Sequence, residues 1–292
     1  MRRANKDSKL GEKLGKKLGE EARYSNREHT FVICAYQQSP YLEACILSLK
    51  KQSVKSKIWM VTSTENDFVH EMAKKYRIPL LINSGESGIT QDWNFALQIA
   101  QTPLVTLAHQ DDFYCRDYLK TVLQKANAFP KPLLIFTDYG ELRNGRWVKN
   151  NRLLKIKRML LWPLEFESLA KSRFVRRRIL ALGNPISCPT VTYCKPNLPQ
   201  PVFEKGFLCS EDWQAWEKIS RCHGEFLYCK NLLVYHRIHE ASTTSKVLGE
   251  TGRSAEDYEM FLKFWPKPVA KILTKLYAGS EKSNELQEKK SK

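Results

Sequence analysis

The stretch that decides the fold is FVICAYQQSPYLEACILSLKKQSVKSKIWMVT, residues 31–62. It opens with a short apolar run that contains β-branched residues and ends at the polar pair before Pro40, which indicates a buried strand. The apolar residues after Pro40 recur at helical spacing, and KIWMVT is a second apolar run. A strand, a helix and a strand in this order predict a right-handed crossover between parallel strands.

The same alternation continues to residue 138. Apolar runs predict further strands at 78–83, 103–108 and 132–138, and amphipathic stretches predict helices at 67–76, 90–100 and 117–127. This pattern predicts an α/β fold with a mainly parallel central sheet flanked by helices. In such a sheet the ligand binds beyond the carboxyl ends of the strands, so we expect the functional residues directly after each strand.

After residue 140 the alternation weakens. We expect short strands at 188–194, 224–229 and 232–238, a helix at 212–220, and two C-terminal helices within 255–277 that are interrupted at Pro266 and Pro268. The final residues are polar, which favours a disordered end.

Composition and charge narrow the class of protein. The chain has 292 residues, of which 42% are apolar and 27% charged, which is typical of a soluble globular protein and excludes a mainly disordered or fibrous one. No apolar run is long enough to span a bilayer, and no apolar run follows the basic start, so we expect no secretory signal and a cytoplasmic location. The eight cysteines include no CxxC pair, which favours free thiols.

The formal net charge of +17 is concentrated in three segments. Residues 142–178 hold twelve Lys or Arg against two Asp or Glu, and residues 1–27 and 263–292 are also basic, while the remainder is slightly acidic. This distribution indicates an anionic surface or partner that contacts particular segments.

The first chemical motif is AHQDDFY, residues 108–114, at the end of the predicted fourth strand. Asp111 and Asp112 offer hard oxygen ligands beside the imidazole of His109, a combination that suits Mg²⁺ or Mn²⁺ bridging phosphate oxygens. An equally good interpretation is structural, because Asp112 is able to cap the following turn.

Two further motifs lie in the second half of the chain. CSEDWQAW places Glu211 and Asp212 at the start of a helix, where acidic residues are favoured whatever the protein does. YHRIHEAS places Arg237 and His239 on one face of a strand, a pair that suits a diphosphate but is equally compatible with a solvated strand end.

Taken in order over residues 30–245, these motifs resemble the family 2 glycosyltransferases, which have a GT-A fold and transfer a sugar from a nucleotide-sugar donor. ICAYQQSPYLEACILSLKKQ is similar to the family's opening strand and helix, in which a tyrosine lies along the nucleotide base. GITQDWNFALQIA is similar to the segment in which Gly88, Asn94 and Ala96 place a helix against the donor. AHQDDFY resembles the metal motif, and Asp212 of SEDW corresponds to the catalytic base.

The resemblance implies inverting transfer to a hydroxyl, with Asp212 as the base and Glu211 as the next choice. It implies that Asp111 and His239 hold Mn²⁺ or Mg²⁺ and that the donor is a UDP-sugar. The implied donor-binding residues are Ala35, Tyr36, Ser63, Asp92, Asn94, His109, Gln110, Asp111, Asp112 and Arg237.

This sequence departs from the family pattern at two positions. Paired aspartates usually follow the second strand, where this chain has Thr62 and Ser63, and the metal motif usually begins with aspartate, where this chain has His109. The hydroxyl of Ser63 is still able to form a hydrogen bond with a base edge, and Asp111 remains as a metal ligand.

These inferences divide the chain into a basic flexible tail (1–27), a nucleotide-sugar-binding half (28–140), an acceptor-side half with the basic segment and the base (141–245), and C-terminal helices with a polar tail (246–292). The basic segment interleaves cations with leucines and a tryptophan, which suits a membrane interface, although such leucines also commonly pack in a core. We therefore expect a peripheral protein on the inner face of the cell membrane that glycosylates a glycan or lipid-linked acceptor in cell-surface polysaccharide or glycoconjugate synthesis.

Three other classes of protein share some of these sequence features. A nucleotidyltransferase needs a basic residue near the α-phosphate early in the chain, but Lys50 and Lys51 fall within a predicted helix. A nucleic-acid-binding protein is disfavoured because the basic segment carries no recognisable module. An inactive glycosyltransferase-like or nucleotide-binding protein, associated with an anionic membrane or polymer, remains the alternative.

Overall fold

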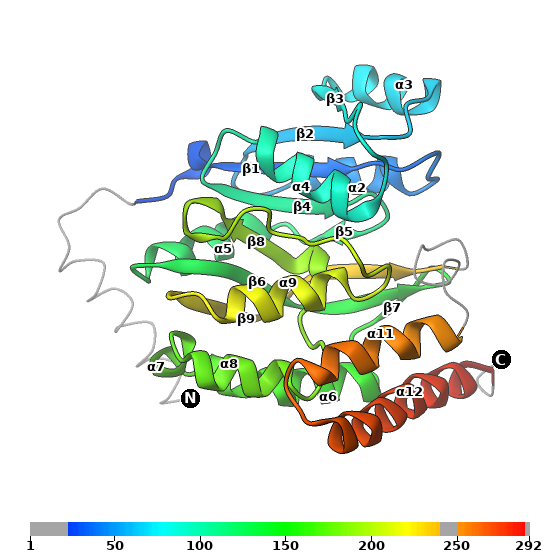
Figure 1. Cartoon of the computed structure of the whole chain (residues 1–292). Coiled ribbons are helices and arrows are strands. Elements are labelled where there is room, and N and C mark those ends of the chain that lie inside the picture. The colour runs from blue at the N-terminus through cyan, green and yellow to red at the C-terminus, as the bar shows by residue number, and fades with distance from the viewer. Residues whose placement is uncertain (1–22, 240–249, 290–292) are drawn as a thin grey trace.

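The computed structural model describes residues 23–239 and 250–289, so the first 22 residues of the predicted basic tail lie outside the described residues. The strands are β1 (His29–Cys34), β2 (Lys57–Thr62), β3 (Leu80–Ile82), β4 (Leu104–His109), β5 (Phe113–Tyr114), β6 (Pro132–Arg143), β7 (Arg146–Val148), β8 (Val191–Cys194) and β9 (Glu225–Ile238). The helices are α2 (Leu42–Lys50), α3 (Asp67–Tyr76), α4 (Ile89–Ile99), α5 (Tyr118–Asn127), α6 (Arg152–Leu161), α7 (Glu167–Ala170), α8 (Arg173–Leu180), α9 (Glu211–Ser220), α11 (Glu250–Leu262) and α12 (Lys267–Lys289). Figure 1 shows the strands as one central sheet with helices packed around it.

The sheet confirms the predicted α/β class. Its strands follow the order β3-β2-β1-β4-β8-β6-β9-β5, and β7 pairs with β6. The first half is parallel, with β1 between β2 and β4, as the strand–helix alternation predicts. The second half is mixed, because β8 runs antiparallel to both β4 and β6, whereas β6 and β9 are parallel. Since β6 extends past residue 140, the two predicted halves share this sheet.

Alternate residues of the central strands pack into two separate hydrophobic clusters. Val32 and Leu107 belong to one cluster, which receives side chains of α4, α8, α9, α11 and α12. Phe31 and Ala108 belong to the other cluster, which receives side chains of α2, α3 and α5. Because side chains alternate between the faces of a strand, the two clusters mark the two faces of the sheet. Helices therefore cover both faces and leave the strand ends as the place for a site.

The predicted strands at 224–229 and 232–238 form one strand, β9, in the structure. The exposed polar residues Lys230 and Asn231 resemble a turn in the sequence, but the chain stays extended through them. Two extra residues are accommodated by a register shift, in which Thr137 faces Cys229 and Asp138 faces Leu232. The consequence is that β9 runs the full length of β6 and delivers residues 236–239 to the end of β4.

The two predicted C-terminal helices are present as α11 and α12. Helix α12 continues to Lys289, so the prediction of a disordered end directly after residue 277 is wrong. The break falls between Leu262 and Lys267, so Pro266 precedes α12 and Pro268 lies in its first turn, where a missing N–H costs no helical hydrogen bond. None of the helices within residues 23–239 and 250–289 combines the length and the hydropathy needed to cross a bilayer.

Candidate active site

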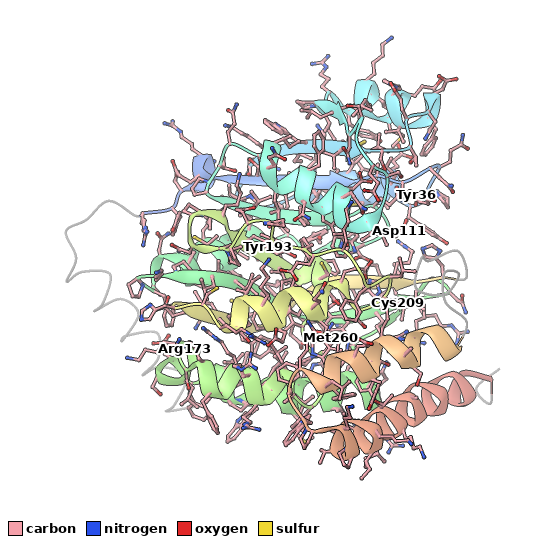
Figure 2. The ribbon with its side chains drawn as sticks, in the orientation of Figure 1. Tyr36, Asp111, Arg173, Tyr193, Cys209 and Met260 are labelled. Carbon is pink, nitrogen blue, oxygen red and sulfur yellow. The ribbon has the colours of Figure 1, made fainter. Side chains whose placement is uncertain are left out.

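A cavity of about 620 Å³ opens at the carboxyl ends of β1 and β4. Residues from four segments line it: Cys34–Tyr36, Glu86–Trp93, His109–Asp111, and Lys205–Leu208 with Glu211. Six of the ten predicted donor-binding residues are in this wall, namely Ala35, Tyr36, Asp92, His109, Gln110 and Asp111. Tyr36 and Asp111 lie near each other on this side of the molecule in Figure 2. The strand ends thus meet where the parallel-sheet rule places a ligand.

Tyr36 and Gln110 connect the ends of β1 and β4. The backbone N–H of Tyr36 donates to Gln110 Oε1 over 3.0 Å, and Gln110 Nε2 donates to the carbonyl oxygen of Tyr36 over 2.9 Å. This reciprocal pair fixes the backbone of the loop after β1. The Tyr36 side chain is 50% exposed, so its ring stands at the rim of the cavity and is available to an aromatic ligand.

The carboxylate of Asp92 is held by residues directly after two neighbouring strands, β2 and β3. The Ser63 hydroxyl donates to Asp92 Oδ2 over 2.7 Å, and Asn83 Nδ2 donates to Asp92 Oδ1 over 2.7 Å. Ser63 itself is outside the cavity wall and acts here through Asp92. Because both oxygens are held, the first turn of α4 presents an oriented acceptor to the cavity.

Asn94 also lies outside the cavity wall. Its side-chain amide donates to the Phe203 carbonyl oxygen over 2.8 Å, and its Oδ1 accepts from the Phe203 N–H over 3.1 Å. This paired contact ties α4 to the segment that leads into residues 205–208. Asn94 therefore shapes the opposite wall of the cavity.

The adjacent residues Asp111 and Asp112 point to different environments. Asp111 faces the cavity, where Ser39 Oγ donates to its Oδ1 and His239 Nε2 lies 3.2 Å from its Oδ2. Asp112 is buried, and it accepts from the Arg237 N–H over 2.8 Å and contacts His236 Nδ1 at 3.0 Å. Asp112 thus joins the end of β4 to β9 instead of capping a helix. Arg237 completes this joint by donating from Nε to the Asp111 carbonyl oxygen over 2.8 Å.

The Asp112–His236 contact is an ion pair. Burial opposes the charged form of both groups, yet each partner stabilises the charge of the other. The pKa of Asp112 is held below its ordinary value by His236, and the pKa of His236 is held above its ordinary value by Asp112. The residue corresponding to the second aspartate of the motif is therefore part of the scaffold of the site.

His109 occupies the first position of the motif and lines the cavity. Its ring stacks on Trp93 with 5.2 Å between ring centroids. Within the part of the chain that the structure describes, His109 Nε2 is buried and has no hydrogen-bond partner. Burial lowers the pKa of His109, so the ring is neutral near pH 7 and is able to offer a nitrogen lone pair.

These residues fit a divalent cation that a substrate brings with it. Among the described residues, no three His, Cys, Asp or Glu side chains are grouped as metal ligands. Mg²⁺ is usually held by one or two carboxylates together with substrate phosphates, and not by a complete protein cage. Such a set of ligands is present here. Asp111 lies in the cavity wall, and His239 contacts one of its carboxylate oxygens. The His109 nitrogen without a hydrogen-bond partner is two residues away in the chain.

The start of α9 carries two acidic residues in different positions. Glu211 lines the cavity and is 5% exposed, and burial raises its pKa to about 7, with Asp212 and Glu256 adding to the effect. Asp212 is outside this wall. Its Oδ1 accepts from Asn184 Nδ2 over 2.9 Å and from the Trp213 N–H over 2.7 Å, and burial raises its pKa.

The loop before α9 is held by a residue that the sequence does not reveal. The Glu256 carboxylate of α11 accepts from the backbone N–H groups of Leu208, Cys209 and Ser210 over 2.7, 2.9 and 3.0 Å. Cys209 marks this loop in Figure 2, between the sheet and α11. No local pattern points to Glu256, because the contact spans about 46 residues of chain. It ties both the cavity wall and the start of α9 to the C-terminal helices.

The raised pKa of Glu211 predicts a dependence of stability on pH. Between its ordinary value of 4.5 and about 7, the folded protein binds this proton more tightly than the unfolded chain does. The free energy of unfolding therefore falls as the pH rises through this window, by up to about 3 kcal/mol. Glu211→Gln removes this loss, so the variant should be more stable than the wild type at pH 8 but not at pH 4.

Urea unfolding at several pH values checks this expectation. Glu71→Gln, on the exposed face of α3, is the matched control and should follow the wild type at every pH. Equal pH dependence in Glu211→Gln and the wild type would contradict the buried, uncompensated state of Glu211.

Comparison with known proteins agrees with this geometry. The profile of Glycosyl transferase family 2 matches residues 30–189. The structure is similar to residues 1–349 of TarS from S. aureus in complex with UDP-GlcNAc, with a TM-score of 0.57 and 16% identity over 84% of this chain and 70% of that chain. It is also similar to the mannosyltransferase PcManGT from Pyrobaculum calidifontis in complex with GDP-Man and Mn²⁺, with a TM-score of 0.54 and 13% identity over 92% of this chain and 76% of that chain. A search of curated proteins finds no significant match.

Proposed function

Because the chain belongs to glycosyl transferase family 2 and is a glycosyltransferase that uses a nucleotide-sugar, we propose that it transfers the sugar of a UDP-sugar, with inversion, to a hydroxyl of a lipid-linked glycan. The observation that carries the proposal is the cavity at the ends of β1 and β4. It brings an exposed aromatic ring, an oriented carboxylate and the Asp111 carboxylate into one wall. The aromatic ring suits the face of a nucleotide base, and the oriented carboxylate suits an N–H group at the edge of that base. The Asp111 carboxylate suits the cation of a diphosphate.

In this proposal the nucleotide base lies along Tyr36 and Ala35. The Asp92 carboxylate, held by Ser63 and Asn83, accepts the N–H of the base. Uracil has such an N–H between its two carbonyl groups, which supports a UDP-sugar. The relatives add that UDP-GlcNAc and GDP-Man are both bound on this fold, so the choice of nucleotide needs a direct test.

The diphosphate is placed against Asp111, with Arg237 and His239 behind it. A divalent cation bound there supplies Lewis-acid neutralisation of the charge on the leaving group. Asp111 and His239 are the residues that would hold it, and Arg237 contributes a fixed positive charge at the Asp111 carbonyl oxygen. The guanidinium of Arg237 is oriented by Tyr41, whose ring centroid lies 4.1 Å away.

The base of the reaction is Asp212. Single displacement requires that the base lie on the face of the sugar opposite the leaving group. We place the sugar between the diphosphate and the start of α9, where Asp212 directly follows the cavity-wall residue Glu211. Asp212 takes the proton of the acceptor hydroxyl as the oxygen attacks the anomeric carbon, and the bond to the diphosphate breaks. Asn184 orients the Asp212 carboxylate. The raised pKa of Asp212 makes this carboxylate a stronger base than that of a solvated aspartate.

The acceptor is proposed to be presented at the inner face of the cell membrane. The basic segment 142–178 contributes α6 and α8, and the positive charge of Lys157 on α6 stabilises the negative charge of Asp212. An acceptor that reaches Asp212 from this side meets cationic residues first. A glycan attached to a phosphate-linked lipid has the matching charge.

A thermal-shift screen with UDP-, GDP- and dTDP-sugars, each with and without Mn²⁺, tests the donor assignment. A ligand that binds only the folded protein raises its melting temperature, and at one fixed ligand concentration the shift grows with the logarithm of the affinity. We expect a UDP-sugar to give the largest shift and Mn²⁺ to increase it. No stabilisation by any nucleotide-sugar would contradict the proposed donor site, and a larger shift with GDP-mannose would reassign the nucleotide.

A further inference from the structure

The outer surfaces of α6, α8 and α12 combine exposed apolar side chains with lysine and arginine. On α6 and the turn after it, Met159 and Trp162 are 66% and 57% exposed. On α8, Phe174 is 69% exposed, and on α12, Ile272 and Leu276 are 60% and 65% exposed. Large apolar side chains exposed together on one surface mark an interaction site more often than single ones do.

These three helices lie next to one another although they are far apart in the sequence. Figure 1 shows α6, α8 and α12 along the same edge of the molecule, at the bottom of the view. Contacts confirm this, because α12 packs on α6, and Trp265, two residues before α12, donates from Nε1 to the carbonyl oxygen of Ala181, directly after α8, over 2.7 Å. Arg173 of α8 projects at this edge in Figure 2. We call the exposed side of α6 with Trp162 directly after it, of α8, and of residues 267–278 of α12 the lower face.

Charge on the lower face is of one sign. Residues 152–161, 173–180 and 267–278 contain no Asp or Glu. The exposed cations of these segments are Arg152, Lys155, Arg173, Arg178, Lys267, Lys271 and Lys275. Between α6 and α8, Glu165 and Glu167 are paired with Lys230 and Lys125. The first acidic residue after residue 278 is Glu281.

The spacing on α12 is that of a helix that lies on a surface. Lys267, Lys271 and Lys275 recur every four residues, and the last two are each followed by an exposed aliphatic residue, Ile272 and Leu276. The opposite side of α12 is buried through Ala270 and Thr274. Lysines beside aliphatic residues are able to keep their ammonium groups at a charged surface while their stems cover apolar atoms.

Only some of the apolar residues of the basic segment are exposed at the surface of the folded protein. Leu154, Leu161 and Leu164 pack in the interior, so they take no part in an outer surface. Met159, Trp162 and Phe174 remain outside, and α12 adds a second stripe from another part of the chain. The lower face is therefore a property of the fold and not of one continuous segment.

We propose that the lower face docks on an anionic phospholipid bilayer, an inference that rests on the proposed lipid-linked acceptor. A cationic, acid-free surface with an exposed tryptophan and aliphatic side chains fits the interface of such a bilayer. Helix α6 connects this surface to the chemistry, because Lys155 and Met159 are exposed on the lower face while Lys157 donates to the Tyr139 hydroxyl, and the charges of Lys157 and Asp212 stabilise each other. An acceptor anchored in the bilayer would thus reach Asp212 past α6.

Vesicle co-sedimentation tests the docking. The probes are vesicles of phosphatidylcholine alone and vesicles that also contain about one third phosphatidylglycerol, at low and high salt. We expect the full chain to bind the anionic vesicles at low salt only. Lys267→Gln, Lys271→Gln and Lys275→Gln together should weaken binding about 100-fold, and Trp162→Ser with Phe174→Ser should weaken it about tenfold.

The matched control is a triple change of the same type at the other end of the molecule, at Lys51 directly after α2, Lys57 on β2 and Lys74 on α3. These lysines are exposed, so the control removes the same net charge. Equal loss in control and test variants, equal binding to neutral vesicles, or no binding by the wild type would overturn the proposal. A dimer in solution that Trp162→Ser disrupts would also overturn it, because a second copy would then cover the lower face.

The same variants separate this proposal from the proposed function. Their melting temperature should rise with a UDP-sugar and Mn²⁺ as much as that of the wild type, because the lower face is remote from the donor cavity residues. Both proposals are supported if the lower-face variants no longer bind vesicles while the donor raises their melting temperature as much as that of the wild type. A donor shift without any vesicle binding by the wild type refutes the docking alone, and vesicle binding without a donor shift refutes the proposed function.

Discussion

Replacing Asp212 with Asn is expected to lower kcat by roughly 10²–10⁴ while donor binding stays nearly unchanged. The amide keeps the size of the side chain and its contact with Asn184, but it cannot take the proton of the acceptor hydroxyl. Only the chemical step should therefore suffer. Transfer assays under saturating donor, combined with calorimetric titration of the donor, measure the two quantities separately.

Asp117→Asn is the matched control for this variant. Asp117 precedes α5, is exposed and makes no capping hydrogen bond, so the same chemical change there should leave kcat unaltered. Wild-type turnover in Asp212→Asn would show that the base lies elsewhere. Glu211 would then be the next candidate, because it lines the cavity and its pKa is raised to about 7.

The second large effect is expected from Asp111→Ala. This change removes the cavity-facing carboxylate that Ser39 and His239 orient, so donor binding in the presence of Mn²⁺ should weaken strongly. Donor binding by the variant should also become independent of Mn²⁺. Titration of a nucleotide-sugar into the wild type and the variant, in Mn²⁺ and in EDTA, measures both.

Asp138→Asn on β6 is a control that lies outside the cavity wall, where the aspartate is paired with Arg158. Its donor affinity should keep the Mn²⁺ dependence of the wild type. Full affinity of the wild type in EDTA would contradict the role of Asp111 and would indicate that Arg237 neutralises the diphosphate.

Much of the fold follows from local patterns in the sequence. The first four strands and the helices between them are continuous in the chain, so the period of the apolar residues is enough to predict them. The parallel arrangement then places Ala35, Tyr36, His109 and Asp111 at one edge of the sheet, as the structure confirms. These residues share a wall because they follow adjacent strands.

The remainder depends on contacts between distant segments. Asp111 and Asp112 are indistinguishable as a sequence pair, and only the arrival of His236 and Arg237 on β9 turns Asp112 into a buried ion pair. The sequence predicts two strands where β9 is one, because Lys230 and Asn231 resemble a turn. In the structure these two residues form a shift in the register of the strand. Glu256 likewise acts on a loop about 46 residues away. Such pairings are set by tertiary packing, which no local pattern reports.

We propose that one cavity holds the donor between β1, α4 and β4 while Asp212 faces the sugar from the other side. A crystal structure with a UDP-sugar and Mn²⁺ tests it most directly. We predict the uracil along Tyr36 and beside Asp92, the diphosphate and the cation at Asp111, and the anomeric carbon between the diphosphate and Asp212. A nucleotide bound outside this cavity, or an anomeric carbon with Asp212 on the same side as the diphosphate, would contradict the account.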